Sequence, residues 1–315
     1  MPELQNKFSW SVSAREDFEV CPRRRYWSKY AMWHGWKSSA TPLQRTAYRL
    51  NKMDNRFTIQ GNAVERAVMW ALTQTRLDVA PDPEQTYQTA ARNYLNQCWS
   101  DSKNERWRGD PKRHCCLHEH YYPDNYNLSE QEMVENMMTT VKTCITNFTK
   151  TLLPELAAIP AANEIAVATT AVGDPESFML DEIKIYAIPD YVIRVDGALR
   201  IYDWKSGRPR PAHKDQMDIY GLWAHCRHRR PDEPTTMHLA YLAEPRLLSA
   251  ELMEDGPART TAMIKDSVAH MAEYLENGDI QANRPLPSDH WEMCPDMHVC
   301  YKCNFYELCR PELES

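Results

Sequence analysis

The chain has 315 residues, enough for one large domain or two modest domains with a buried core. Its composition, with 43% hydrophobic and 26% charged residues, is typical of a soluble globular protein and excludes a low-complexity chain. The formal net charge of −7 excludes a generic basic coat for nucleic acid, so any such contact must come from a local basic patch.

The ten cysteines are interpreted as thiols of a reducing compartment. The first residues, Met1 to Lys7, contain no apolar signal core, and a chain of this length needs no disulfide bonds for stability. The sequence also contains no run of about 20 apolar residues of the kind that crosses a membrane. We therefore expect a cytoplasmic protein.

Residues 9–36 are predicted to be helical, with Ser11 or Ser13 as the first cap and an interruption at Pro22. Cys21 lies at this interruption. The segment that follows mixes arginine and lysine with aromatic residues. Such a mixture either holds phosphates and stacks bases or forms a solvated basic face above aromatic packing, and both interpretations stay open.

Three further helices are predicted over residues 57–77, 82–104 and 128–153. The last of them opens with a capping box, in which a serine is followed three residues later by a glutamate. Its apolar stripe includes Cys144 and is typical of a core face, so this cysteine is interpreted as a small buried hydrophobe.

Residues 114–120 contain two adjacent cysteines and three histidines. Zinc accepts both kinds of ligand, but the spacing does not match the commoner zinc motifs. The default interpretation of this segment is a polar loop with exposed thiols, and a zinc site is the alternative.

From Glu164 onward the periodicity changes from helices to strands. Strands are predicted over residues 165–172, 178–188 and 236–242, with a helix beginning near Lys214 ahead of the last one. A long helix over residues 258–276, closed by an Asn-Gly pair, follows.

A β-hairpin is predicted within residues 187–207. Two β-branched and aromatic runs, 191–195 and 199–204, meet at an Asp-Gly dipeptide that suits a tight turn. Antiparallel pairing brings Asp190 close to Asp203 and Lys205. Because side chains alternate between the faces of a strand, the latter two share one face.

Two carboxylates and an ammonium group on one spot have a defined chemistry. Mg²⁺ takes oxygen ligands and is usually held by one or two carboxylates with water and phosphate. A neighbouring lysine positions the attacking water and offsets negative charge on the phosphate. The alternative is an ordinary surface hairpin whose polar ends are solvated.

The hairpin resembles the signature of the PD-(D/E)XK nucleases, with Asp190 as its first half and Asp203 and Lys205 as its second. Gln216 and Tyr220 follow, one helical turn apart and on one face. In RecB-like nucleases a Gln-x-x-x-Tyr pair follows the lysine in this way. The resemblance implies that both residues contact the metal site or the DNA.

RecB-like nucleases also carry a Gly-x-x-x-His helix ahead of the hairpin. Here Gly61 matches the glycine, and Glu65 stands where the family has histidine. The resemblance implies that Glu65 is an oxygen ligand of the metal. The alternative is a surface glutamate on a helix.

The cysteine pattern carries the same resemblance. Cys21 lies far upstream of Cys300, Cys303 and Cys309, which are arranged as C-x₂-C-x₅-C. This arrangement resembles the iron–sulfur staple of the AddB nuclease and of CRISPR-associated RecB-like nucleases, which implies a [4Fe–4S] cluster. Four thiolates suit Zn²⁺ equally. Cys294 is a fifth candidate that competes with Cys300.

The loop after the lysine adds Arg208, Arg210 and Lys214, which are interpreted either as a phosphate-contacting rim or as solvated charges. The resemblance implies an α/β, restriction-endonuclease-like core, a mixed sheet flanked by helices, with an added helical region and an iron–sulfur staple. The expected segments are an N-terminal segment (1–56), a helical region (57–160), the nuclease core (161–280) and a C-terminal cysteine segment (281–315).

The expected function is a Mg²⁺- or Mn²⁺-dependent DNA nuclease, an exonuclease on single-stranded or end-containing DNA in repair, recombination or phage defence. Its partners would be DNA and a helicase or a repair or defence complex, because no Walker motif is present in the sequence. Two alternatives are a catalytically weak scaffolding subunit of a nuclease complex and a zinc-stabilised DNA-binding protein.

Overall fold

The computed structural model describes residues 4–167, 175–228, 230 and 232–314. Its main sheet has five strands in the order β10-β9-β8-β7-β4. Neighbouring strands are antiparallel except β8 and β9, which run parallel. The strands are β4 (Glu164–Val167), β7 (Tyr191–Val195), β8 (Ala198–Lys205), β9 (Thr235–Tyr241) and β10 (Arg246–Glu251).

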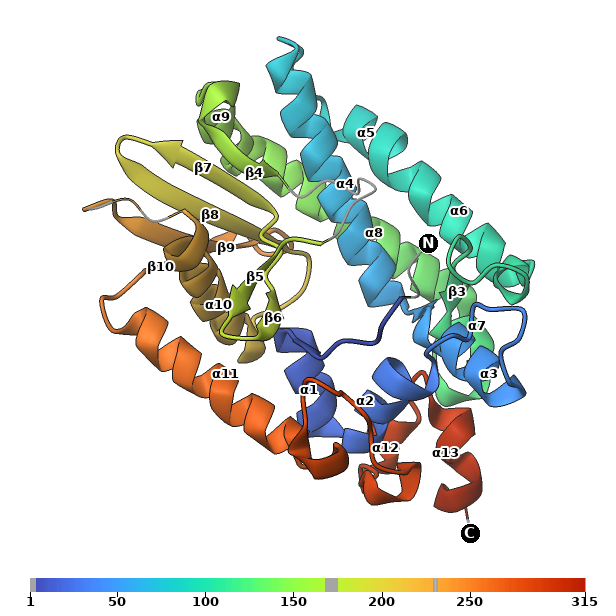
Figure 1. Ribbon diagram of the computed structural model, residues 1–315. Helices are drawn as coiled ribbons and strands as arrows, with labels where there is room; N and C mark the ends of the chain where they lie inside the picture. The colour runs from blue at the N-terminus through green and yellow to red at the C-terminus, as the bar shows by residue number, and fades with distance from the viewer. Residues whose placement is uncertain (1–3, 168–174, 229, 231, 315) are drawn as a thin grey trace.

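Helices cover both faces of this sheet (Figure 1). On one face lie α4 (Arg56–Arg76) and α8 (Glu130–Thr151). On the other lies α10 (Ala212–Arg227), against which α11 (Gly256–Ala272) packs. The mixed sheet with helices on both faces agrees with the expected mixed α/β class.

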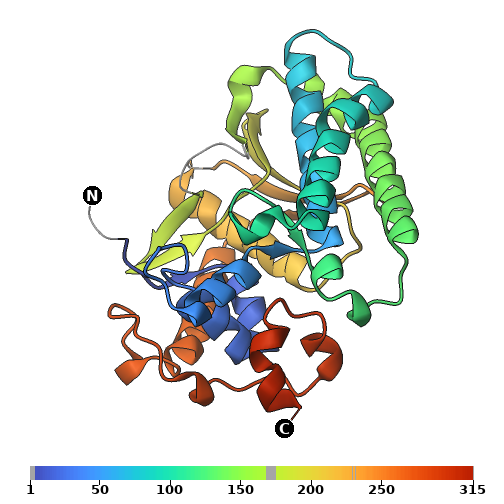
Figure 2. The same ribbon diagram turned by 90° about the vertical axis from the view of Figure 1, so that its right-hand side faces the viewer.

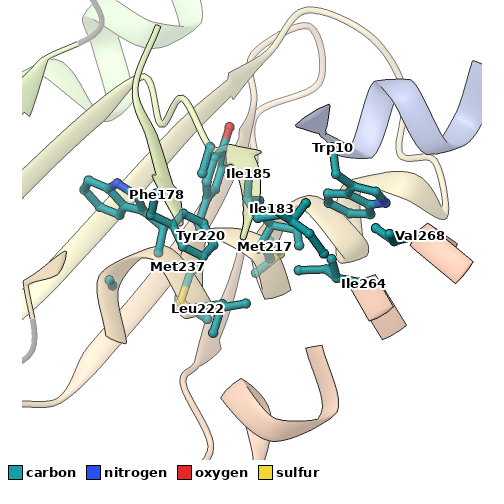
Figure 3. Packing of buried hydrophobic residues seen from close by; sticks show 14 of the residues in the cluster. Trp10, Phe178, Ile183, Ile185, Met217, Tyr220, Leu222, Met237, Ile264 and Val268 are labelled. Atoms are coloured by element: carbon teal, nitrogen blue, oxygen red, sulfur yellow. The ribbon is translucent and has the colours of Figure 1, made fainter. Parts of the chain in front are cut away.

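The alternation of side chains along β8 divides the core in two. Trp204 points toward α8, where its ring meets the ring of Phe148 edge-on with 5.5 Å between centroids. Leu199 and Ile201 belong to the cluster on the opposite face, with α10. Figure 3 shows Met217, Tyr220 and Leu222 of α10 within that cluster, together with Met237 of β9, Phe178, Ile183, Ile185, Trp10, Ile264 and Val268.

A second sheet of three strands replaces the single strand expected over residues 178–188. That segment forms two strands, β5 (Ser177–Leu180) and β6 (Ile183–Tyr186), because Asp181 between them adopts a positive φ of 50° and reverses the chain. β1 (Ser9–Trp10) pairs in parallel with β6. The remaining short strands, β2 (Met53–Asp54) and β3 (Cys116–Leu117), form a parallel pair.

The remaining helices lie mainly around the N- and C-terminal segments and beside α4. Two π-helical segments, Trp27–Ala31 and Tyr87–Arg92, continue α2 and α5. The helices are α1 (Val12–Val20), α2 (Pro22–Tyr26), α3 (Pro42–Asn51), α5 (Pro83–Thr86), α6 (Asn93–Lys103), α7 (His118–Tyr121), α9 (Leu153–Ala157), α12 (Met297–Cys300) and α13 (Tyr306–Leu313).

Most of the expected helices are confirmed in position. Ser11 caps α1, accepting a hydrogen bond from the backbone N–H of Ala14 at 3.1 Å, and the helix breaks at Cys21 as expected. The capping box at Ser129 opens α8. The helix expected over residues 258–276 ends earlier, at Ala272.

Two segments were wrongly predicted or missed. Residues 114–120 are not a polar loop with exposed thiols, since Cys116 and His118 are buried within β3 and α7. Strand β10 has no counterpart among the predicted strands. Residues 168–172 of the expected strand 165–172 lie outside the described residues.

The N-terminal and C-terminal segments lie side by side (Figures 1 and 2). Arg23, which is 3% exposed, joins them: its Nε donates to the Trp291 carbonyl oxygen at 2.8 Å, and its Nη1 lies 2.9 Å from Glu312 Oε1. Lys29 Nζ donates to the Lys7 carbonyl oxygen at 2.8 Å. This segment was expected either to bind phosphates and bases or to form a solvated basic face. Arg23 and Lys29 do neither, because both side chains bind groups of the protein itself.

The division of the chain into four segments stays a prediction. Among the described residues, no helix combines the length and the apolar character that crossing a membrane requires.

Candidate active site

The β7–β8 hairpin places the two expected carboxylates at its open end. Its tight turn uses positive φ angles at Asp196 (52°) and Gly197 (71°). Tyr191 is paired with Tyr202, so the residue before Tyr191, Asp190, lies beside the end of β8. Its Oδ2 accepts a hydrogen bond from the backbone N–H of Trp204 at 2.7 Å.

Asp203 is the centre of a hydrogen-bonded network and is 3% exposed. From α10, Gln216 Nε2 donates to its Oδ1 at 3.1 Å. The Tyr220 hydroxyl has two acceptors within reach of its single proton, the same oxygen at 2.7 Å and the Ile188 carbonyl oxygen at 3.0 Å. Lys205 Nζ contacts Asp203 Oδ2 and donates to Gln216 Oε1 at 2.6 Å. All four side chains are therefore held in one arrangement.

The acids of this cluster repel one another. Although part of Asp190 is accessible, burial of its carboxyl group raises its pKa well above the usual range, and the charge of Asp203 adds to the shift. Burial also raises the pKa of Glu65 on α4, where Arg66 opposes the shift and Asp203 adds to it. The three carboxyl groups therefore interact unfavourably when charged, and the Lys205 ammonium group lies beside them.

This donor set fits a hard divalent cation. Asp203 Oδ2 is buried, and the Lys205 ammonium group touches it. Within the described part of the chain, no group of three or more His, Cys, Asp or Glu side chains is placed to hold a metal ion. Mg²⁺ does not require such a group, because it keeps several waters and binds through one or two carboxylates. Asp190 and Asp203 supply two.

Through Lys205 the cluster adjoins a cleft with a volume of about 960 Å³, bounded by α4, α8 and the loop after β8. Arg208 and Arg210 line this cleft, whereas Lys214 is exposed at the start of α10 and does not. A second cavity of about 520 Å³ shares Lys205, Arg210 and His213 with it. The two cavities therefore meet at these three residues.

His213 fixes Arg210 at this junction. Burial, together with the nearby cations of Lys205 and Arg210, lowers the pKa of His213 to about 4, so the ring is neutral at neutral pH. Its Nδ1 lies 2.7 Å from the Tyr241 hydroxyl and 3.3 Å from the backbone nitrogen of Arg210, and its Nε2 lies 3.3 Å from Arg210 Nε. A neutral ring accepts at only one of its nitrogens, so it accepts either the backbone N–H or the side-chain Nε–H of Arg210.

The four expected cluster cysteines line one small apolar cavity of about 20 Å³, together with Cys294. The indole N–H of Trp27 donates to Cys309 Sγ at 3.2 Å, and the backbone N–H of Cys294 donates to Cys21 Sγ at 3.3 Å. Burial, together with the neighbouring sulfurs, raises the pKa of Cys300 to about 11. The structure brings these cysteines together as free thiols from both ends of the chain.

A profile of the PD-(D/E)XK nuclease superfamily matches residues 9–310, nearly the whole chain. The chain belongs to the PD-(D/E)XK nuclease superfamily. No curated protein matches the chain. Membership of this superfamily indicates a nuclease that acts on nucleic acid, and PD-(D/E)XK nucleases typically use a divalent metal.

Three residues that sequence reasoning did not single out line the cleft of this PD-(D/E)XK protein: Arg56 and Phe57 at the start of α4, and Arg246 at the start of β10. Phe57 lies inside a correctly predicted helix, but an apolar residue there is ordinarily assigned to the core. Arg246 belongs to a strand that was not predicted. An adjacent Arg-Phe pair at the helix start was the one signal available.

Proposed function

We propose that the protein is a metal-dependent deoxyribonuclease that hydrolyses phosphodiester bonds in single-stranded or end-containing DNA. The observation that carries the proposal is the meeting of Asp190, Asp203 and Lys205 at the end of β8, where Lys205 lines two adjoining cavities. The resemblance to RecB-like nucleases adds exonucleolytic action and a place in repair, recombination or phage defence beside a helicase or similar partner.

Each side chain has a task in this proposal. Asp190 and Asp203, with Glu65 facing them from α4, would hold one or two Mg²⁺ or Mn²⁺ ions. When bound, the metal supplies Lewis-acid chemistry at the scissile phosphate. Lys205 orients the attacking water and offsets negative charge that develops on the phosphate. Gln216 and Tyr220 hold the Asp203 carboxylate in position.

Cys21, Cys300, Cys303 and Cys309 would hold a [4Fe–4S] cluster that fastens the two chain ends, with Zn²⁺ as the alternative and Cys294 as the alternative to Cys300. The N–H groups directed at Cys21 and Cys309 are of the kind that tune thiolate clusters. Iron or zinc content of anaerobically purified protein separates the two metals.

The test is cleavage of end-labelled single-stranded and duplex DNA with Mg²⁺, Mn²⁺ or EDTA. We expect metal-dependent cutting by the unaltered protein and by Lys265→Ala, whose lysine lies on α11 and pairs with Asp181. Lys205→Ala should not cut. Failure of the unaltered protein to cut any substrate with either metal would overturn the proposal and favour a scaffolding subunit.

A further inference from the structure

Phe57 is a large apolar side chain that faces solvent at the mouth of the active-site cleft. It lies in the first turn of α4, lines the cleft and is 63% exposed. The guanidinium group of Arg56 lies over its ring, with Cζ 4.6 Å from the centroid. An exposed aromatic ring with a cation over it presents an apolar surface next to charge.

The backbone beneath this ring is fixed. Asn55 Oδ1 accepts from the backbone N–H of Phe57 at 2.9 Å, and Glu119 Oε1 accepts from that of Arg56 at 3.1 Å. Glu119 is 7% exposed and comes from α7, so a second element anchors the start of α4. The ring is thus mounted on a rigid base.

The cleft around Phe57 is electropositive although the whole chain is acidic. Arg208 and Arg246 line it, and neither forms an ion pair with a carboxylate in the described part of the chain. Glu244 is the single acid among the lining residues. Unpaired arginines next to an exposed aromatic ring match a ligand that carries both phosphates and planar bases.

The walls of the cleft approach each other at one end of its lining. At Gly61, α4 approaches the loop after β8, since a Cβ there would lie 3.8 Å from Ser206 Oγ. The volume of about 960 Å³ is that of a site for a ligand of a few rings. A base presents a free face to an aromatic side chain only where it is not stacked inside a duplex, so stacking on Phe57 requires unpaired nucleotides.

We propose that the cleft binds nucleic acid as a single strand, with one base stacked on the free face of Phe57 and the phosphates along Arg208 and Arg246. This inference rests on the proposed nuclease function of the adjoining site. It adds Phe57 as a residue that determines the preference for single strands.

The test measures binding of a short labelled single strand and of the matching duplex by fluorescence anisotropy in EDTA, where no cutting is needed. Phe57→Ala should weaken single-strand binding by about fivefold to a hundredfold, the range for one lost base–aromatic stack. Phe57→Trp should retain binding. Leu77→Ala is the matched control, because Leu77 caps the other end of α4 and is 64% exposed.

A strand of the same length with abasic residues isolates the stacking contribution. The unaltered protein and Phe57→Ala should bind it equally, since no base is present to stack. Equal binding of the normal strand by both proteins would overturn the inference, as would an equal loss on the abasic strand, which would indicate a structural role. Because cutting is assayed separately with Lys205→Ala, either proposal can fail while the other stands.

Discussion

Removing the Tyr220 hydroxyl tests the arrangement of the candidate active-site cluster. Tyr220 is 3% exposed, so water does not replace a lost hydroxyl group. Tyr220→Phe removes the contacts with Asp203 Oδ1 at 2.7 Å and Gln216 Nε2 at 2.7 Å. A hydrogen bond to a charged group contributes about 1.5–3 kcal/mol, so we expect the free energy of unfolding to fall by a similar amount. With Asp203 less firmly held, metal affinity should fall about 10- to 100-fold.

The assay is the rate of DNA cleavage as a function of Mg²⁺ concentration. The half-saturating concentration should rise about 10- to 100-fold in Tyr220→Phe, while the rate at saturating metal changes much less. Tyr30→Phe is the control, because it also removes a phenol hydrogen bond, to Asn283 Oδ1 at 2.9 Å, but not in this cluster. An unchanged Mg²⁺ requirement in Tyr220→Phe, or an equal shift in Tyr30→Phe, would refute the reasoning.

Three other outcomes are expected. In EDTA, Asp190→Asn should unfold at a higher temperature than the unaltered protein, and the difference should grow with pH. Burial and the charge of Asp203 raise the pKa of Asp190 in the folded protein above its unfolded value of roughly 4. Below that unfolded value the carboxyl group is protonated in both states and does not destabilise the fold. As the pH rises toward the folded value, the unfolded state loses this proton first, which destabilises the unaltered protein but not Asp190→Asn; thermal unfolding across pH checks this. Cys309→Ser, but not the exposed Cys226→Ser, should lower bound iron or zinc and the unfolding temperature, measured by metal analysis and calorimetry. Arg208→Ala should weaken DNA binding and reduce the slope of log affinity against log salt by about 0.7–0.9, the change for one lost phosphate contact.

The hairpin could be predicted because its determinants are local. An Asp-Gly pair fixes the turn, and the turn fixes the register, so the positions of Asp190, Asp203 and Lys205 follow from alternation alone. The helical spacing of Gln216 and Tyr220 is equally local. The structure places all five side chains in one cluster, and their chemical roles stay predictions.

What the sequence did not disclose depends on contacts between distant segments. An apolar Phe57 would be expected in the core and a basic Arg23 at the surface, yet the structure exposes the first and buries the second. Both outcomes depend on which elements pack nearby. The division of residues 178–188 into two strands depends on Asp181, a non-glycine residue with positive φ, and such residues leave no reliable pattern in a sequence.

The formal charge of −7 is a poor guide to what the protein binds, because some of its cations pair within the fold and others face the cleft. Arg23 and Lys29 are used to join parts of the fold, whereas Arg208 and Arg246 face the cleft without ion pairs in the described residues. At physiological salt the Debye length is about 8 Å, so acids elsewhere on the surface are screened from a phosphate in the cleft. The local cations therefore decide whether a strand is bound, and binding should weaken steeply as salt is raised, even though the protein as a whole is negatively charged.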